Sequence, residues 1–219
     1  MRAAVTVDRL WPGEPFLVCG TGPSLSAADL ALWRQSSPRP RLIVVNNAVQ
    51  LAPDADVLYA ADAQWWTWNI AVADTALPAL LFGAQPSISR VRATVRIIAT
   101  RNGNGISTDP SWIYSGGHGG HQAINVAALL GAASIALLGF DMGADRAGRH
   151  HFHPAHPNGT HPTYRARLPA FRGLRAALDA LHIPIVNCSR QTAIPADVIP
   201  RQPLEVALSA SWLLTSKPA

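Results

Sequence analysis

Cysteine is scarce in this sequence: only Cys19 and Cys188 occur among its 219 residues. Two cysteines cannot form a disulfide scaffold, and each lies in an apolar run that is typical of a strand. We therefore expect two buried, free thiols and a reducing compartment, because an unpaired cysteine commonly packs as a small apolar residue.

Lysine is nearly absent, since 17 of the 18 basic residues are arginine and Lys217 is the exception. The formal net charge is +5, but the basic residues are scattered and never cluster in groups of five or more. This scatter argues against binding to nucleic acid. The planar arginine side chain suits phosphate, so the composition is compatible with an anionic small-molecule ligand.

Charged residues make up only 14% of the chain and apolar residues 48%, which argues against disorder. We expect one domain over residues 1–219, with its core at about 15–200, and no secretory signal before Asp8. One uncharged run, 123–140, is near the lower limit for a membrane span. Its pattern changes midway from helical to strand-like, so we expect a buried helix and strand in a soluble, cytoplasmic protein without a membrane span.

Apolar runs alternate with helical patterns along the chain. The runs predict strands at 15–19, 41–46, 56–60, 77–82, 95–100, 134–140 and 183–188, and helices from about 26 and at 120–131, 164–181 and 203–210. This alternation predicts a single Rossmann-like α/β domain, with a mostly parallel sheet and helices on both faces. Ligands of such a sheet bind at the carboxyl ends of its strands, so the residues there are the candidates.

The first predicted strand ends in Gly20-Thr21-Gly22-Pro23-Ser24-Leu25. Glycines allow a close approach of the backbone, and the helix N-terminus that follows favours an anion. The segment lacks the Gly-Lys-Ser/Thr of a P-loop, and Leu25 occupies the third glycine position of the dinucleotide fingerprint. Two interpretations remain, a phosphate- or nucleotide-binding turn and a plain strand-to-helix turn.

Polar residues also follow the second and third predicted strands, where Asn46, Asn47 and Asp62 lie. Each could act only as a helix cap or an Asx turn. Their position after adjacent strands favours one shared pocket. The aromatic segment 65–68 could stack on a sugar or base, or else belong to the core or a subunit interface.

Two Gly/His/Pro-rich segments without regular periodicity, 101–119 and 143–162, are expected to be long loops. The first leads into a helix that opens with Gly119, Gly120, His121 and Gln122, where backbone amides could close on a ligand. The second follows Asp141 and contains His150, His151, His153, His156 and His161. A metal site, a general base and a solvated loop are the three interpretations, and we expect no metal because the spacing matches no standard zinc pattern.

In combination, these segments resemble a known superfamily. The resemblance rests on the turn at 20–25, on Asn47, on Gly119-Gly120-His121-Gln122-Ala123, and on the strand ends Leu138-Gly139-Phe140-Asp141-Met142 and Val186-Asn187-Cys188-Ser189. Over about 15–200 the chain resembles the small bacterial sialyltransferases of glycosyltransferase family 42. It equally resembles the related domain-of-unknown-function 115 proteins, which include an archaeal 6-hydroxymethylpterin diphosphokinase type. Small proteins with a similar His-x-His-x-x-His loop are encoded by tailed bacteriophages.

The resemblance implies roles for particular residues. It places the turn of Gly20, Thr21, Gly22 and Ser24 at the nucleotide phosphates, and Asn47, with Asp62 beside it, at the donor or nucleotide. It places the backbone of Gly119 and Gly120, ahead of His121 and Gln122, against the nucleotide. It implies a loop histidine as catalytic base, with His161 as the nearest counterpart and His156 as the alternative. Tyr164 is a candidate for the tyrosines that assist the leaving phosphate, and Arg149, Arg165 and Arg167 flank the loop and could hold that phosphate.

Three functions follow as hypotheses. The favoured one is a glycosyltransferase-like enzyme that transfers from a nucleotide-sugar to a hydroxyl acceptor and requires no cofactor. The alternative is an ATP- and Mg²⁺-dependent, diphosphokinase-like phosphoryl transferase, in which Asp62 and Asp141 bind the ion. The third is a nucleotide-binding protein without catalysis. In each case the expected partner is a small-molecule nucleotide or sugar-nucleotide, and a homo-oligomer is left open.

Overall fold

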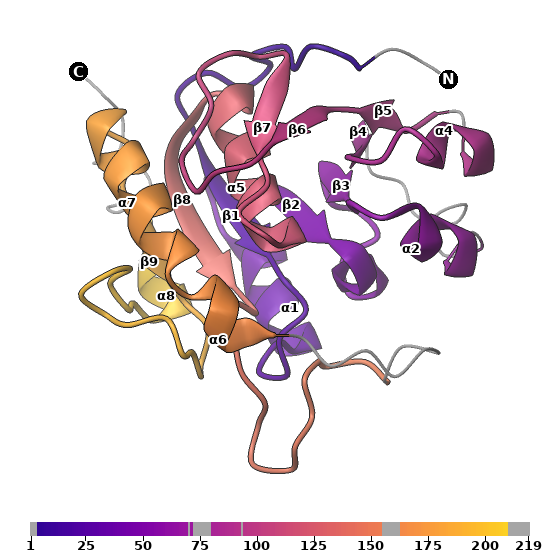
Figure 1. The fold of residues 1–219 in the computed structure, drawn as a ribbon. Helices are drawn as coiled ribbons and strands as arrows, with labels where there is room; N and C mark the ends of the chain where they lie inside the picture. Colours follow the sequence, from indigo (N-terminus) through magenta and orange to yellow (C-terminus); the bar gives the residue numbers. More distant parts are fainter. Residues whose placement is uncertain (1–3, 70, 72–79, 93, 155–162, 210–219) are drawn as a thin grey trace.

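A seven-stranded parallel sheet forms the centre of the protein in a computed structural model that describes residues 4–69, 71, 80–92, 94–154 and 163–209 (Figure 1). The strand order is β5-β4-β3-β2-β1-β8-β9, and every neighbouring pair is parallel. The strands are β1 (Glu14–Cys19), β2 (Arg41–Val45), β3 (Val57–Tyr59), β4 (Leu80–Gly83), β5 (Arg96–Ile97), β8 (Ala132–Leu138) and β9 (Ile185–Asn187). The α/β fold class predicted from the sequence is thereby confirmed.

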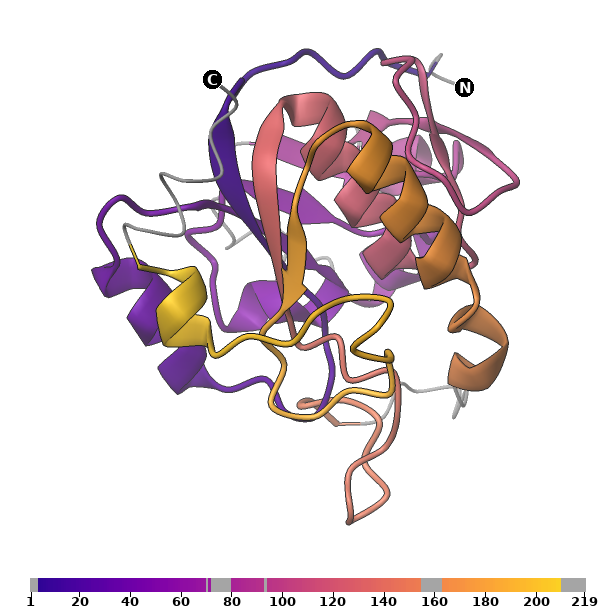
Figure 2. The ribbon, with the colours of Figure 1, turned by 90° about the vertical axis from the view of Figure 1, so that its left-hand side faces the viewer.

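Helices cover both faces of this sheet, so that the molecule has three layers (Figure 2). Because successive strand residues point to opposite faces, Phe16 and Val18 of β1 pack in one core, and Leu17 and Cys19 pack in the other. The first core is covered by α5 (Gly119–Leu130) and α7 (Ala170–Ala180). The second contains residues of α1 (Ala27–Gln35), η1 (Asn46–Gln50), α2 (Ala63–Trp68), α4 (Ile88–Val91) and α8 (Leu204–Ala207).

The single strand expected at 95–100 is divided between two sheets. Ile97 of β5 pairs with Gly83, whereas Ala99 opens β6 (Ala99–Arg101), which pairs in parallel with β7 (Trp112–Tyr114). The segment 101–119, expected to be a loop without regular structure, therefore contains a strand. The prediction failed because a three-residue strand flanked by polar and glycine residues has too short a pattern to stand out.

The long helix expected at 164–181 is also divided, into α6 (Tyr164–Arg167) and α7. Pro169 is the N-cap of α7, and a proline has no amide hydrogen to continue the ladder of the preceding turn. The apolar spacing of Phe171, Leu174 and Leu178 survives the break, and all three side chains are fully buried. The sequence pattern thus predicted these buried positions and the start at Tyr164 correctly, and missed the break before α7.

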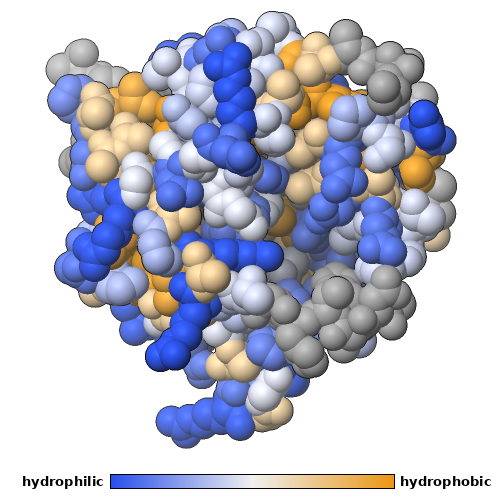
Figure 3. Space-filling model, in the orientation of Figure 1, coloured by the Kyte–Doolittle hydropathy of each residue, from blue (hydrophilic) through white to orange (hydrophobic). Residues whose placement is uncertain are grey.

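Both cysteines are buried and unpaired, as expected from the sequence. Burial raises the pKa of the Cys188 thiol to about 12 and raises that of Cys19 further, so neither is a thiolate at neutral pH. Of the aromatic segment 65–68, Trp65 and Trp66 belong to the core, whereas Trp68 is exposed. On the face shown in Figure 3, the described apolar side chains lie in small groups between hydrophilic ones and form no extended apolar surface.

Candidate functional site

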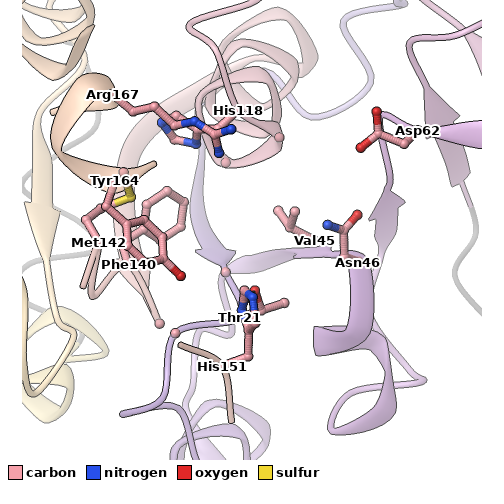
Figure 4. Close-up of a pocket in the computed structure, with 15 residues that line it drawn as sticks. Thr21, Val45, Asn46, Asp62, His118, Phe140, Met142, His151, Tyr164 and Arg167 are labelled. Atoms are coloured by element: carbon pink, nitrogen blue, oxygen red, sulfur yellow. Dashed lines mark hydrogen bonds between the residues drawn. The ribbon is translucent and has the colours of Figure 1, made fainter. Parts of the chain in front are cut away.

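A cavity of about 310 Å³ opens at the carboxyl ends of the central strands (Figure 4). Its wall combines the turn after β1, the ends of β2 and β8, the start of α5, the loop after β8 and helix α6. The lining residues are Gly20, Thr21, Gly22, Val45, Asn46, Asp62, His118, Gly119, Gly120, Gly139, Phe140, Met142, His151, Tyr164 and Arg167. The segments proposed from the sequence to share a pocket therefore do lie together.

The strand order explains why the cavity forms at this place. Strand β1 lies between β2 and β8, and the chain runs from β1 to β2 on one side and reaches β8 later on the other. The chain after β1 leads to α1 on one face of the sheet and the chain after β8 leads to α7 on the other, so the two connections leave the sheet in opposite directions. In open parallel sheets, ligands bind at such a switch point.

The turn after β1 packs directly against the end of β8. The amides of Gly20 and Gly22 donate to the carbonyl oxygens of Leu138 and Gly139, at 2.7 and 2.8 Å. A Cβ atom on Gly22 would lie 2.1 Å from Oδ1 of Asp141, and one on Gly20 would lie 2.7 Å from the Gly139 oxygen. These two glycines are therefore required by the contact between strands, whether or not a ligand is bound.

Ser24 and Asp141 bond to each other and do not line the cavity. The Ser24 amide donates to Asp141 Oδ2 at 2.9 Å, and the Ser24 hydroxyl donates to Oδ1 at 2.8 Å. Burial raises the pKa of Asp141, and the two hydrogen bonds from Ser24 oppose that shift. Arg190, beyond β9, donates to the Ser24 carbonyl at 2.7 Å and pairs with Asp29 at the start of α1. Asp141, Arg190 and Asp29 therefore hold the turn after β1 in place.

The N-terminus of α5 forms the opposite wall of the cavity. The amides of Gly119 and Gly120 belong to the first helical turn, where no intrahelical acceptor exists, and both residues line the cavity. A Cβ atom on Gly120 would lie 2.7 Å from the ring of Phe140, whereas one on Gly119 would meet only Val45 and Tyr59, at 3.5 and 3.9 Å. The fold itself thus requires a glycine at 120 but not at 119.

His121 and Gln122, predicted to contact the ligand, are buried within α5 and point away from the cavity. His121 Nε2 lies 3.1 Å from the carbonyl oxygen of Asn104, and burial lowers the pKa of this imidazole. The carbonyl oxygen of the Gln122 side chain accepts from the Tyr59 hydroxyl at 2.7 Å. Both side chains therefore hold α5 against its neighbours.

The polar residues after β2 and β3 have different roles. Asn47 is buried and accepts a hydrogen bond from the Trp65 indole at 2.6 Å, so it anchors α2. The preceding residue, Asn46, lines the cavity with a positive φ of 51°, a conformation that asparagine adopts more readily than most residues. Asp62 also lines the cavity, and its carboxylate accepts from Gln85 Nε2 at 3.2 Å.

The histidine-rich loop returns to the turn after β1. His151 Nδ1 lies 3.1 Å from the Thr21 hydroxyl, and the Phe152 amide donates to the Thr21 carbonyl at 3.2 Å. The Tyr164 hydroxyl donates to the His150 carbonyl at 3.0 Å, which ties α6 to the same loop. His151 thus lines the cavity, while His156 and His161, the predicted bases, lie outside the described residues.

Two side chains of opposite charge face each other across the cavity, Arg167 on α6 and Asp62 after β3 (Figure 4). Of the arginines that flank the loop in the sequence, Arg165 is exposed outside the cavity lining, and Arg149 pairs with Asp145 at 2.7 Å. Arg167 alone of the three lines the cavity, beside the α5 N-terminus. Positive potential is therefore concentrated at the α5 side of the site.

Several lining residues were not singled out as ligand contacts from the sequence, chiefly Val45, His118, Phe140 and Met142. A usable signal existed for His118, because a residue immediately before a helix start is its N-cap. For Phe140 and Met142 the signal was their place after an apolar strand. The sequence alone does not show which of two neighbouring residues faces the cavity, because that depends on the tertiary packing.

No protein-family model matches the chain, and no curated protein matches it either. Within the described ranges, no three His, Cys, Asp or Glu side chains form a group that could hold a metal ion. Among the helices of the same ranges, none combines the length and the apolar character needed to cross a membrane.

Proposed function

We propose that the protein is a glycosyltransferase-like enzyme that binds a nucleotide-sugar in the cavity at the β1/β8 switch point. The observation that carries the proposal is the convergence there of the α5 N-terminal amides, which have no intrahelical acceptor, and the Arg167 guanidinium. Helix N-terminal amides and guanidinium groups are the protein groups best suited to a phosphate. We place the nucleotide phosphate against this wall and the sugar toward Asn46 and Asp62.

In the transfer step, the oxygen of an acceptor hydroxyl forms a bond to the anomeric carbon. The bond between that carbon and the phosphate oxygen breaks, and its electron pair leaves with the nucleotide. A loop histidine takes the hydroxyl proton, and we assign this role to His161, with His156 as the alternative. Support comes from the course of the loop, because His151, which precedes both, already lines the cavity.

The Mg²⁺-dependent alternative is less well supported. It requires Asp62 and Asp141 to bind the ion together, yet both carboxylate oxygens of Asp141 accept hydrogen bonds from Ser24. Asp62 is the carboxylate that lines the described part of the cavity. Within that part, a magnesium ion would find a single protein carboxylate, whereas phosphoryl-transfer sites commonly use further ligands besides one acid.

Calorimetric titration with CMP, UDP, GDP and ATP, each with and without Mg²⁺, tests the proposal. We expect one nucleoside phosphate to bind without Mg²⁺, and the corresponding nucleotide-sugar to bind at least as well. With an acceptor identified, His161→Ala or His156→Ala should reduce turnover by about a hundred- to ten-thousandfold at nearly unchanged affinity. Binding of ATP alone, and only with Mg²⁺, would instead establish the phosphoryl-transfer alternative. Binding without turnover of any acceptor would indicate a nucleotide-binding protein.

A further inference from the structure

His118 is the N-cap of α5, and its ring is held in a fixed position. Its Nδ1 accepts a hydrogen bond from the His121 amide at 3.2 Å. The ring centroid lies 5.3 Å from that of Phe171 on α7, so the imidazole packs on an apolar side chain. These contacts determine the direction of the ring and leave the second ring nitrogen, Nε2, for other partners.

The hydrogen bond at Nδ1 also determines which nitrogen carries the proton. A backbone amide can only donate, so Nδ1 must be unprotonated and the proton of the neutral ring must reside on Nε2. Burial, together with the nearby His121 and Arg167, lowers the pKa of His118 to about 3. At neutral pH this imidazole is an uncharged hydrogen-bond donor and a poor base.

This donor has no acceptor in the described structure. His118 Nε2 is buried, and no hydrogen-bond partner for it exists among the described residues. A buried polar group without a partner is uncommon and costs stability, so such a group calls for an explanation. Here the explanation lies in its surroundings, because His118 lines the same cavity as the free amides of α5.

Arg167 lies over this part of the cavity wall (Figure 4). A Cβ atom built on Gly117, next to His118, would lie 3.9 Å from Cγ of Arg167, and the Arg167 charge lowers the pKa of His118. Nε2 is buried from solvent, so a ligand must displace a neighbouring side chain to reach it. Arg167 is the long, flexible side chain best placed to move, because an anion would attract its guanidinium.

We propose that His118 is a ligand-binding residue that donates a hydrogen bond from Nε2 to a phosphoryl oxygen, while Arg167 moves to pair with the same phosphoryl group. The inference rests on the proposed function, since it takes the ligand to carry phosphate. It differs from the role expected for the loop histidines: His118 binds and orients the phosphoryl group and transfers no proton.

The variant His118→Asn separates the two hydrogen bonds of this side chain. Asparagine is among the best N-cap residues, and its Oδ1 can accept from the His121 amide in place of Nδ1. It has no group at the position of Nε2, so only the donor toward the cavity is lost. The second pair of variants is Arg167→Gln and Arg165→Gln, which remove the same charge from two positions of α6, one inside and one outside the cavity lining.

The experiment is calorimetric titration of these variants with CMP, UDP, GDP, ATP and pyrophosphate, after the wild-type protein has shown which of them bind. We expect His118→Asn to weaken binding by about ten- to a hundredfold, the range for a hydrogen bond to a charged group, at an unchanged melting temperature. Arg167→Gln should weaken binding similarly, and Arg165→Gln should not. In spectra of ¹⁵N-labelled histidine, the Nε2–H signal of His118 should shift when the ligand is added.

Three outcomes would overturn the proposal, and they are distinguishable. If the wild-type protein binds none of the five probes, the proposed function fails and this inference fails with it. If the wild-type protein binds a probe and His118→Asn binds it equally well, the assignment of His118 alone is wrong. A ring spectrum with the proton on Nδ1 would also overturn the assignment, independently of any ligand.

Discussion

Ser24 and Asp141 join the two strands that flank the switch point. The backbone amide and the hydroxyl of Ser24 each donate to a different oxygen of the Asp141 carboxylate, at 2.9 and 2.8 Å. Gly22 lies under this pair, with no room for a Cβ beside Asp141. The glycine-containing turn, for which the sequence left open a phosphate-binding role and a plain strand-to-helix turn, is therefore first a structural joint between β1 and β8. The cavity is open beside this joint.

The first prediction compares two glycines that line the same cavity. Gly22→Ala should lower the free energy of unfolding by about 1–3 kcal/mol, because the new Cβ would lie within 2.1 Å of a carboxylate oxygen. Gly119→Ala should leave stability unchanged or raise it by up to about 1 kcal/mol, since alanine favours a helix and meets only ordinary contacts. Urea denaturation measures both values.

The variant Gly119→Ala also reports on binding. An added methyl group at 119 lies at the cavity wall beside Val45, and we expect it to weaken nucleotide binding about tenfold or more. Gly143→Ala is the matched control, because a Cβ there meets nothing closer than 3.8 Å and the residue does not line the cavity. Equal affinity of the 119 and 143 variants would mean that the ligand does not reach the α5 N-terminus.

The central sheet was predictable because its strands are short apolar runs, buried on both faces, that alternate with helical segments. The predicted strand boundaries were wrong where the pairing of a segment depends on residues far away in the chain. Val95 to Thr100 looks like one strand, but Ile97 pairs with Gly83 and Ala99 pairs with Trp112, so the chain passes from one sheet to another. Only the partner strands reveal that division.

The location of the candidate site was predictable as well, because it follows from the carboxyl ends of the strands. The direction of individual side chains was not. Asn47 turns to the Trp65 indole, and Gln122 turns to the Tyr59 hydroxyl, partners that lie 18 and 63 residues away in the chain. Asn46, next to Asn47, and His118, four residues before Gln122, line the cavity instead. A polar residue in the right segment can thus serve either the ligand or the fold.

The second prediction concerns Asn125, which joins α5 to the segment before it. Its Oδ1 accepts from the amides of Ser107 and Tyr114, at 3.0 and 3.3 Å, and its Nδ2 donates to the Gly105 carbonyl at 3.2 Å. Asn125→Ala should lower the free energy of unfolding by about 2–4 kcal/mol, because it leaves buried backbone groups without partners. The exposed control Asn102→Ala should change it by less than about 0.5 kcal/mol. A small effect at 125 would show that water replaces these bonds.

The third prediction concerns the dependence of stability on pH. The folded-state pKa of His118, about 3, lies below its ordinary value of 6.5, so between these values the unfolded chain binds a proton that the folded protein does not. Stability should therefore fall as the pH is lowered from 6.5 toward 3, by up to about 1.4 kcal/mol per pH unit from this residue.

The variant His118→Asn isolates that contribution, because it keeps the helix cap and removes the titrating ring. The free energy of unfolding, measured in urea at several pH values from 7 to 4, should decline less steeply for the variant than for the wild-type protein. His121, whose pKa is also lowered by burial, remains in both proteins and contributes equally to the two slopes. Parallel curves would mean that His118 is accessible to protons in the folded state.

The last prediction distinguishes the two transferase proposals through Asp62. In the glycosyltransferase-like proposal, this carboxylate repels an anionic ligand in the same cavity, so Asp62→Asn should leave nucleotide affinity unchanged or raise it a few-fold. In the diphosphokinase-like alternative, Asp62 binds the ion, and Asp62→Asn should abolish Mg²⁺-dependent binding of ATP. Asp197→Asn is the control, since it removes an exposed carboxylate that does not line the cavity. Calorimetric titration with and without Mg²⁺ measures the difference, and loss of Mg²⁺-independent binding in Asp62→Asn alone would contradict the placement of the phosphate on the α5 side of the cavity.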